Sequence, residues 1–238
     1  MNLLALSSVL VYGDTPYVVR GGQEDYKSIF YSDQNLALTK PISIIGGFGV
    51  LKAGTVMGII TESTNRSGYY VPYTIEEGNF PGAGYQNSYP GLTYVTDDLA
   101  VAKSVSVTMS DSYRFAVGDH LASTDSDGTA TDLGAITAID RTTYSHIAVL
   151  TVTNNAAAAT VAKGAAVWHQ TATSDPYTCA KGILLSSVDT GEGEHAKGAQ
   201  ATLVLSHAIL YKGRLTGYCS DAATDLSSSD DGKYVILK

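Results

Sequence analysis

The chain has 238 residues, which is enough for one large or two small domains that bury a core without disulfide support. Charged residues make up only 16% of it, against a usual share of about 25%, while Gly (24) and Tyr (16) are abundant. A net charge of −8 argues against a protein that coats nucleic acid, and the 44% hydrophobic content excludes a disordered chain. Because long helical periodicity is also missing, the composition predicts an acidic all-β protein.

The N-terminal part of the chain has the character of an extended arm. Residues 1–12 are apolar, but the first basic side chain is Arg20, so the basic start of a secretory signal peptide is missing. The run is also shorter than the roughly 20 residues that cross a bilayer. Residues 1–40 as a whole hold short apolar pieces separated by polar turns. We therefore expect an arm without a targeting or membrane role.

The next part of the chain predicts short strands joined by tight turns. Residues 41–61 are β-branched and rich in glycine, a residue that breaks helices and permits close backbone approach. A turn at 65–68 precedes a strand predicted at 69–73. Two Pro-Gly steps then give residues 76–94 the composition of a linker.

The middle of the chain, from about residue 96 to 173, predicts short strands at regular spacing. Strands spaced at roughly 8 to 12 residues with turns between them indicate a small barrel or sandwich. The predicted strands are 101–108, 115–121, 133–140, 147–153 and 161–169. The best helical candidate in the chain is the short stretch 97–104.

The C-terminal part again predicts short strands joined by turns, as residues 41–75 do. It predicts a strand at 180–188, a polar glycine-rich turn at 189–198 and a long apolar strand at 201–211. An Asp/Ser-rich loop and a final strand at 233–238 complete the chain.

The residue types that bind metals are scattered along the sequence. Cys179 and Cys219 belong to no CxxC or Cys/His pair, and we expect small, partly buried thiols, with a disulfide left open. The five histidines lie at least 12 residues apart, which excludes a local pair of imidazole ligands. We expect surface or hydrogen-bonded strand histidines, although a site assembled through the fold stays open. They are His120, His146, His169, His195 and His207.

Two short motifs have a simpler explanation than the ligand they suggest. The run Gly191-x-Gly193-x-x-Ala196 matches the dinucleotide fingerprint, but a β-branched strand follows it instead of a helix, so a hairpin loop is expected. Asp125-x-Asp127-Gly128 lacks the later ligands of a calcium loop and predicts an Asp-Gly turn. No nucleophile elbow or P-loop is present. We expect no catalytic residue, no cofactor and no metal.

The tyrosines leave two interpretations open. Tyr combines a large flat face with one hydroxyl and is favoured at protein contacts, but an all-β fold also accepts half-buried strand tyrosines. Those that cluster away from an obvious core are Tyr12, Tyr17, Tyr26, Tyr31, Tyr69, Tyr70, Tyr73, Tyr85, Tyr89 and Tyr94.

Three segments outside the middle of the chain share a pattern with a known family. They are Leu51–Gly58 (LKAGTVMG), Ala180–Leu184 (AKGIL) and Val204–Leu215, which contains His207. Together with their flanks, about 100 residues in all, they resemble the phage head decoration proteins of the lambda type. The resemblance rests on residues with structural roles, not chemical ones.

The middle of the chain departs from this family, whose simplest members lack such a segment. We interpret residues 92–173 as a small β-barrel domain inserted into a decoration-protein-like barrel, or tulip, domain made of 41–91 and 174–238, with 1–40 as the arm. Insertion into a loop is tolerated when the ends of the loop stay close together.

The resemblance implies a structural role without catalysis. It implies a homotrimer on the outer surface of a phage head, at three-fold or quasi-three-fold positions of the major capsid protein lattice, made in the host cytoplasm. Neighbouring decoration trimers are further partners, whereas nucleic acid and membranes are not. The arm would add a strand to a capsid sheet, with six candidate anchors: Leu3, Leu4, Val11, Tyr12, Tyr17 and Val18.

Two other functions stay open. In a surface adhesin or carbohydrate-binding module, exposed tyrosines and Trp168 would stack on sugar rings. A hydrolase would need a His and a carboxylate brought together from distant strands.

Overall fold

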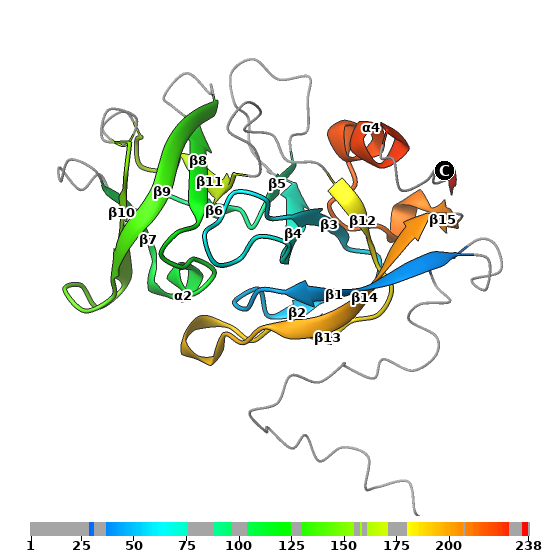
Figure 1. Ribbon diagram of the computed structural model, residues 1–238, viewed down its shortest axis with the longest axis horizontal. Helices are drawn as coiled ribbons and strands as arrows, with labels where there is room; N and C mark the ends of the chain where they lie inside the picture. The colour runs from blue at the N-terminus through cyan, green and yellow to red at the C-terminus, as the bar shows by residue number, and fades with distance from the viewer. Residues whose placement is uncertain are drawn as a thin grey trace, which may run out of the picture.

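The computed structural model describes residues 29–30, 37–75, 88–96, 104–124, 130–154, 158, 161–170, 180–206, 208–228 and 235–237. The protein is all-β, with strands far outnumbering short helices. Two sheet units lie side by side, with the middle of the chain forming one and the two flanking parts forming the other (Figure 1).

The first unit is a five-stranded barrel that we call the outer barrel. Its strands run in the order β1, β14, β12, β3, β4, and a parallel pairing of Ile44 in β1 with Tyr70 in β4 closes the ring. A further strand, β5, pairs antiparallel with the last three residues of β4. The bounds are β1 Leu38–Ile44, β3 Val56–Ile59, β4 Tyr70–Ile75, β5 Ser88–Pro90, β12 Ala180–Leu184 and β14 Ala199–Ser206.

The second unit, the inserted half-barrel, is a six-stranded sheet in the order β6, β11, β8, β9, β10, β7. Its strands are consecutive in sequence between β5 and β12, so the chain leaves the outer barrel, builds this sheet and returns. They are β6 Thr93–Tyr94, β7 Ser104–Thr108, β8 His120–Thr124, β9 Ala130–Asp140, β10 Ile147–Val152 and β11 Ala166–His169. The exact domain boundaries stay a prediction.

Each unit has its own apolar core. Alternation along β10 places Ala148, Leu150 and Val152 inside the half-barrel with Phe115 and Leu133. The outer barrel buries two clusters, one centred on Val56 and Ile183 and the other on Met57 and Leu203. Because adjacent residues of β3 serve different clusters, that strand is buried on both faces.

Short elements complete the fold. Strand β2 (Val50–Leu51) pairs with β13 (Val188–Asp189), and β15 (Ile209–Tyr211) pairs in parallel with β16 (Val235–Leu237). The helices are α2 (Met109–Ser112), α4 (Ser220–Ser228) and the 3₁₀ turns η3 (Gly193–His195) and η4 (Lys212–Arg214). Within the described ranges, no helix has the length and apolarity needed to cross a membrane.

One helix replaces a predicted loop near the C-terminus. Helix α4 covers the start of the Asp/Ser-rich stretch, with Ala222 and Leu226 buried one turn apart on the same face. The Asp225 carboxylate also accepts a hydrogen bond from the Ala180 amide at 2.9 Å. Tertiary packing therefore stabilises a helix that is too short to show clear periodicity. Of the helical candidate 97–104, only Ser104 is described, and it begins β7.

The predicted arm extends too far at its C-terminal end. Ile29 and Phe30 are buried, the Ile29 carbonyl accepts a hydrogen bond from the Tyr211 amide at 3.0 Å, and Phe30 forms a bridge to Leu210. Residues 38–40 already belong to β1. Residues 1–28, with all six candidate capsid anchors, lie outside the described residues.

Candidate functional site at the junction of the two units

The junction joins the loop between β3 and β4 to the segment between α2 and β8. Two backbone hydrogen bonds of 3.1 Å link the two units here: the Thr64 amide donates to the Gly118 carbonyl, and the His120 amide donates to the Glu62 carbonyl. Ser63 and Asp119 form an antiparallel bridge at the same place. The two units are thus tied by backbone as well as side-chain contacts.

Asp119 is the charged centre of this junction. It is completely buried, and a buried carboxylate is tolerated only when it is hydrogen-bonded or paired. The Ser63 hydroxyl and the Ala116 amide each donate to it at 2.8 Å, and the Arg66 guanidinium lies 3.5 Å away. Because Ser63 and Arg66 come from the outer barrel, the carboxylate of the half-barrel binds the two units together.

His169, at the end of β11, lies beside Asp119. Its Nδ1 is 3.9 Å from the Asp119 carboxylate, and its ring packs against Phe115 with 4.8 Å between centroids. Burial lowers the pKa of His169 to about 4, because the attraction of Asp119 is outweighed by desolvation and opposed by Arg66 and Arg114. The imidazole is therefore neutral at pH 7.

Glycine is required opposite this ring. Gly91 has φ +63°, and a Cβ there would lie 2.6 Å from Cδ2 of His169. The Pro-Gly step at residue 90, predicted as a linker feature, thus makes room for the buried histidine.

Arg114 forms a second link across the junction. Its Nε donates to the Gly47 carbonyl and its Nη1 to the Leu92 carbonyl, both at 3.0 Å. Its Nη2 lies 2.7 Å from the Asp111 carboxylate, and the guanidinium stands 5.0 Å from the centre of the Phe48 ring. The Arg114 side chain therefore connects the outer-barrel loop that contains Gly47 to helix α2 of the half-barrel, which contains Asp111.

The arrangement of Ser63, Asp119 and His169 differs from that of a nucleophilic triad. In a triad the imidazole lies between the hydroxyl and the carboxylate. Here Ser63 donates directly to Asp119, and His169 is wholly buried. The fold does bring His169 and the Asp119 carboxylate together, as the hydrolase alternative required. Their arrangement suits a structural contact between the two units.

A pocket of about 600 Å³ opens next to the junction. Its apolar walls include Phe48, Leu51, Pro72 and Leu92, and the cationic side chain of Lys52 also lines it. Asp119 and His169 are not among its lining residues. This volume is within the range of about 300 to 1,000 Å³ that is usual for ligand pockets.

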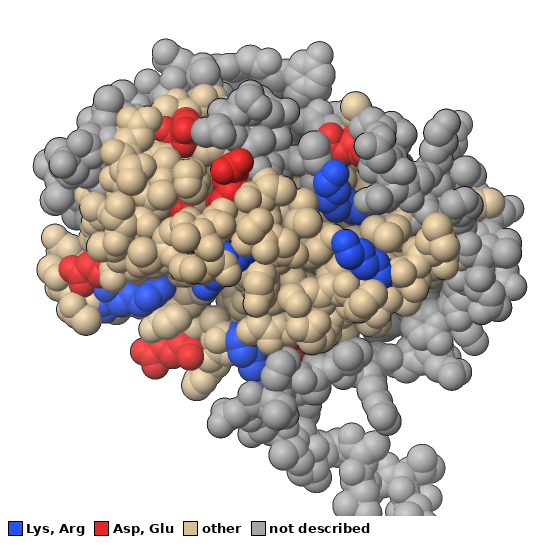
Figure 2. All heavy atoms as spheres, viewed as in Figure 1, with Lys and Arg blue, Asp and Glu red and all other residues tan. Residues whose placement is uncertain are grey.

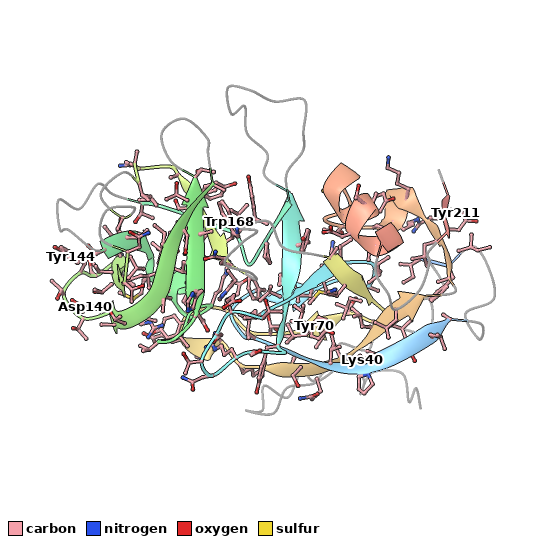
Figure 3. The ribbon with its side chains drawn as sticks, turned by 45° about the horizontal axis from the view of Figure 1, so that its top comes forward. Lys40, Tyr70, Asp140, Tyr144, Trp168 and Tyr211 are labelled. Atoms are coloured by element: carbon pink, nitrogen blue, oxygen red, sulfur yellow. The ribbon has the colours of Figure 1, made fainter. Side chains whose placement is uncertain are left out.

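Trp168 does not provide a sugar-binding platform. Its side chain is completely buried in the half-barrel and stacks on Tyr89 with 4.1 Å between ring centroids. Figure 3 shows it inside the unit, away from the edge that carries Asp140 and Tyr144. The expectation that Trp168 would stack on a ligand is therefore wrong, because the ring fills the core.

The described tyrosines divide between the two interpretations. Tyr70, Tyr73 and Tyr89 are buried, whereas Tyr69 and Tyr94 are exposed. Tyr12, Tyr17, Tyr26, Tyr31 and Tyr85 lie outside the described residues.

The remaining motifs are placed as follows. The run from Gly191 to Ala196 lies in a loop between β13 and β14 that contains η3, but the predicted hairpin is wrong, because β13 pairs with β2 and β14 pairs with β1 and β12. The Cys219 side chain is buried and its Sγ accepts a hydrogen bond from the Ala222 amide. No cluster of three potential metal-ligating side chains occurs among the residues that the structure describes. Cys179, His207 and the 125–128 turn fall outside those residues.

No sequence pattern indicates the residues of the junction. Asp119 falls within the predicted strand 115–121, and Ser63, Arg66 and Arg114 belong to no motif. Ser63 and Asp119 are 56 positions apart in the chain, so no local pattern could indicate their contact.

Comparison with protein-family models, with curated proteins and with solved structures found no match to this chain.

Proposed function

We propose that the protein is a structural decoration protein of a phage head. As a homotrimer it binds the outer capsid surface at three-fold or quasi-three-fold positions and stabilises the lattice of the major capsid protein, with its N-terminal arm adding to capsid sheets. The half-barrel then faces solvent or a neighbouring trimer. The proposal assigns the protein no catalytic step.

The observation that carries the proposal is the spatial arrangement of the three segments that resemble the decoration proteins. They are far apart in sequence, yet residues 56–58, 180–184 and 204–206 lie in the adjacent strands β3, β12 and β14, while residues 209–214 form β15 and η4. In this sheet Ile183 pairs with Val56 on one side and with Val204 on the other. The strand-forming parts of the shared pattern are thus neighbours in one sheet of the barrel.

The glycines of that pattern are required by packing. A Cβ at Gly58 would lie 2.8 Å from the Tyr73 ring, and one at Gly182 would lie 2.6 Å from Leu203. Gly54 has φ +88°, and its Cβ would lie 2.4 Å from the Arg214 carbonyl oxygen. The resemblance therefore rests on positions where another residue would disturb the barrel.

The surface is consistent with a protein that is covered by neighbours. Charged side chains are sparse on the face shown in Figure 2, where most of the described surface belongs to other residues. Several large apolar side chains are exposed, and such residues favour protein contacts when an assembly covers them. They are Leu38, Val50, Tyr69, Tyr94, Val117, Tyr144 and Tyr211.

The proposal is tested by two measurements on the full chain. Native mass spectrometry should give about three times the 24.9 kDa chain mass. The protein should also co-sediment, to saturation, with expanded heads assembled from the major capsid protein of the same phage genome, whereas serum albumin should not. A monomer that stays in the supernatant would refute the proposal.

A deletion tests the arm separately. A variant lacking residues 1–20 should remain trimeric but lose capsid binding, because the deletion removes all six candidate anchors. Unchanged co-sedimentation of that variant would refute the assignment of the arm.

A further inference from the structure

We propose that the pocket of about 600 Å³ beside the junction is a binding site for a small aromatic carboxylate. This inference goes beyond the proposed capsid role and does not rest on it. It follows from the side chains that line the pocket, from the charges among them and from the two units that supply them.

The walls of the pocket are largely apolar. Phe48, Leu51, Pro72 and Leu92 line it together with Tyr73. Two of these five residues, Phe48 and Tyr73, are aromatic, and aromatic side chains favour offset or edge-to-face contacts with another ring. The walls therefore favour a ligand with a flat apolar body.

The charged side chains that line the pocket within the described part of the chain are both cationic, Lys52 and Arg114. Lys52 is exposed and makes no salt bridge to an acidic group among the described residues. The described contacts of Arg114 use three of its five N–H groups, which leaves two for a ligand. The acidic groups that act on Arg114, Asp111 and Glu192, do not line the pocket. The lining therefore favours an anionic group, and a planar carboxylate matches the guanidinium fork.

Both sheet units contribute to this pocket. Leu51 belongs to a core cluster of the outer barrel. Leu92 packs in the apolar cluster that contains Trp168 of the half-barrel, and Arg114 follows helix α2. A ligand in the pocket thus contacts both units, at a place where Arg114 already links them.

The test compares two probes on the full chain, 2-naphthoate and its neutral analogue 2-naphthalenemethanol. Each probe is titrated at pH 7 and low ionic strength into protein whose Leu and Val methyl groups carry ¹³C, and the methyl chemical shifts are followed by NMR. Ligands of this size bind a matching site at about millimolar concentration. We expect 2-naphthoate to shift the methyl signals of Val50, Leu51 and Leu92 with a dissociation constant of about 1 mM or below.

The neutral probe tests the choice of a carboxylate. We expect 2-naphthalenemethanol to bind about fivefold more weakly than 2-naphthoate, because it lacks the charge-assisted hydrogen bonds to the cationic lining. Equal affinity for the two probes would overturn the proposal. The absence of shifts at about 10 mM 2-naphthoate, or shifts confined to methyl groups away from the pocket, would overturn it as well.

Two exposed lysines provide a matched pair of variants. Lys52 lines the pocket, whereas Lys40 lies in β1 and is not among the lining residues. Lys52→Glu should weaken the binding of 2-naphthoate at least fivefold and leave that of the neutral alcohol within about twofold, while Lys40→Glu should change neither. Equal effects of the two substitutions on 2-naphthoate would overturn the proposal. Because these measurements use free protein, their failure is distinguishable from a failure of capsid binding.

Discussion

The buried histidine at the junction makes the stability of the protein depend on pH in a defined direction. The pKa of His169 is lowered from 6.5 to about 4 in the folded protein, chiefly by burial. In the unfolded chain the same imidazole takes up a proton below about pH 6.5. Above pH 6.5 the neutral His169 therefore makes its full contribution to the free energy of unfolding. That contribution is lost as the pH falls from 6.5 towards 4.

The size of the effect follows from the shift. At about 1.4 kcal/mol for each pKa unit, lowering the pKa from 6.5 to about 4 corresponds to about 3 kcal/mol of unfolding free energy. This is a large part of the roughly 5 to 15 kcal/mol that stabilises a typical domain. We expect the free energy of unfolding to fall by up to this amount between pH 7 and pH 4 on account of His169 alone.

The assay compares variants, because carboxylates also titrate in this range. Urea unfolding of wild type, His169→Gln and His146→Gln is measured at pH 7, 6, 5 and 4. His146 is exposed, so its variant serves as the matched control. The difference in unfolding free energy between wild type and His169→Gln should shrink by about 3 kcal/mol from pH 7 to pH 4, whereas the difference for His146→Gln should stay nearly constant.

A constant difference between wild type and His169→Gln across these pH values would refute the reasoning. An NMR titration of the wild type gives a second measurement that does not depend on whether the variant folds. The ring protons of His169 should keep the chemical shifts of a neutral imidazole down to about pH 5.

Three further predictions concern packing and the junction. Gly182→Ala should lower the unfolding free energy by about 1 to 3 kcal/mol because its Cβ meets Leu203, whereas Gly213→Ala, with open space around it, should change it by less than about 0.5 kcal/mol in the same urea assay. Trp168→Ala should cost about 3 to 5 kcal/mol in thermal unfolding, and a small loss would contradict its burial. Ser63→Ala should cost about 1 to 3 kcal/mol in urea unfolding, because the buried Asp119 carboxylate loses a hydrogen-bond donor, and an unchanged value would contradict that role.

Strand positions were largely predictable, but strand ends were not. The predicted strand 180–188 divides into β12 and β13, because the first part pairs with β3 and β14 and the second with β2. The predicted strand 201–211 divides for the same reason, since residues 209–211 pair with β16. Residues 115–119 form a turn instead of a strand because the Asp119 carboxylate accepts the Ala116 amide. A strand ends where its pairing partner changes, and no local sequence pattern indicates that position.

The sequence alone determined the features that depend on near neighbours in the chain. Alternation of apolar and polar residues indicated strands, glycine indicated turns, and the change of style at both ends of the middle segment indicated an insertion. These signals are local, because backbone conformation and side-chain alternation are properties of a few consecutive residues.

Only the tertiary structure decided which distant residues meet. Ser63 meets Asp119 across 56 positions, and Arg114 meets Gly47 across 67. Folding also decided that Trp168 fills a core and that His169 loses its contact with water, which lowers its pKa. Burial and partner choice depend on the whole fold, so the junction, its neutral histidine and the pocket beside it could not be read from any one stretch of sequence.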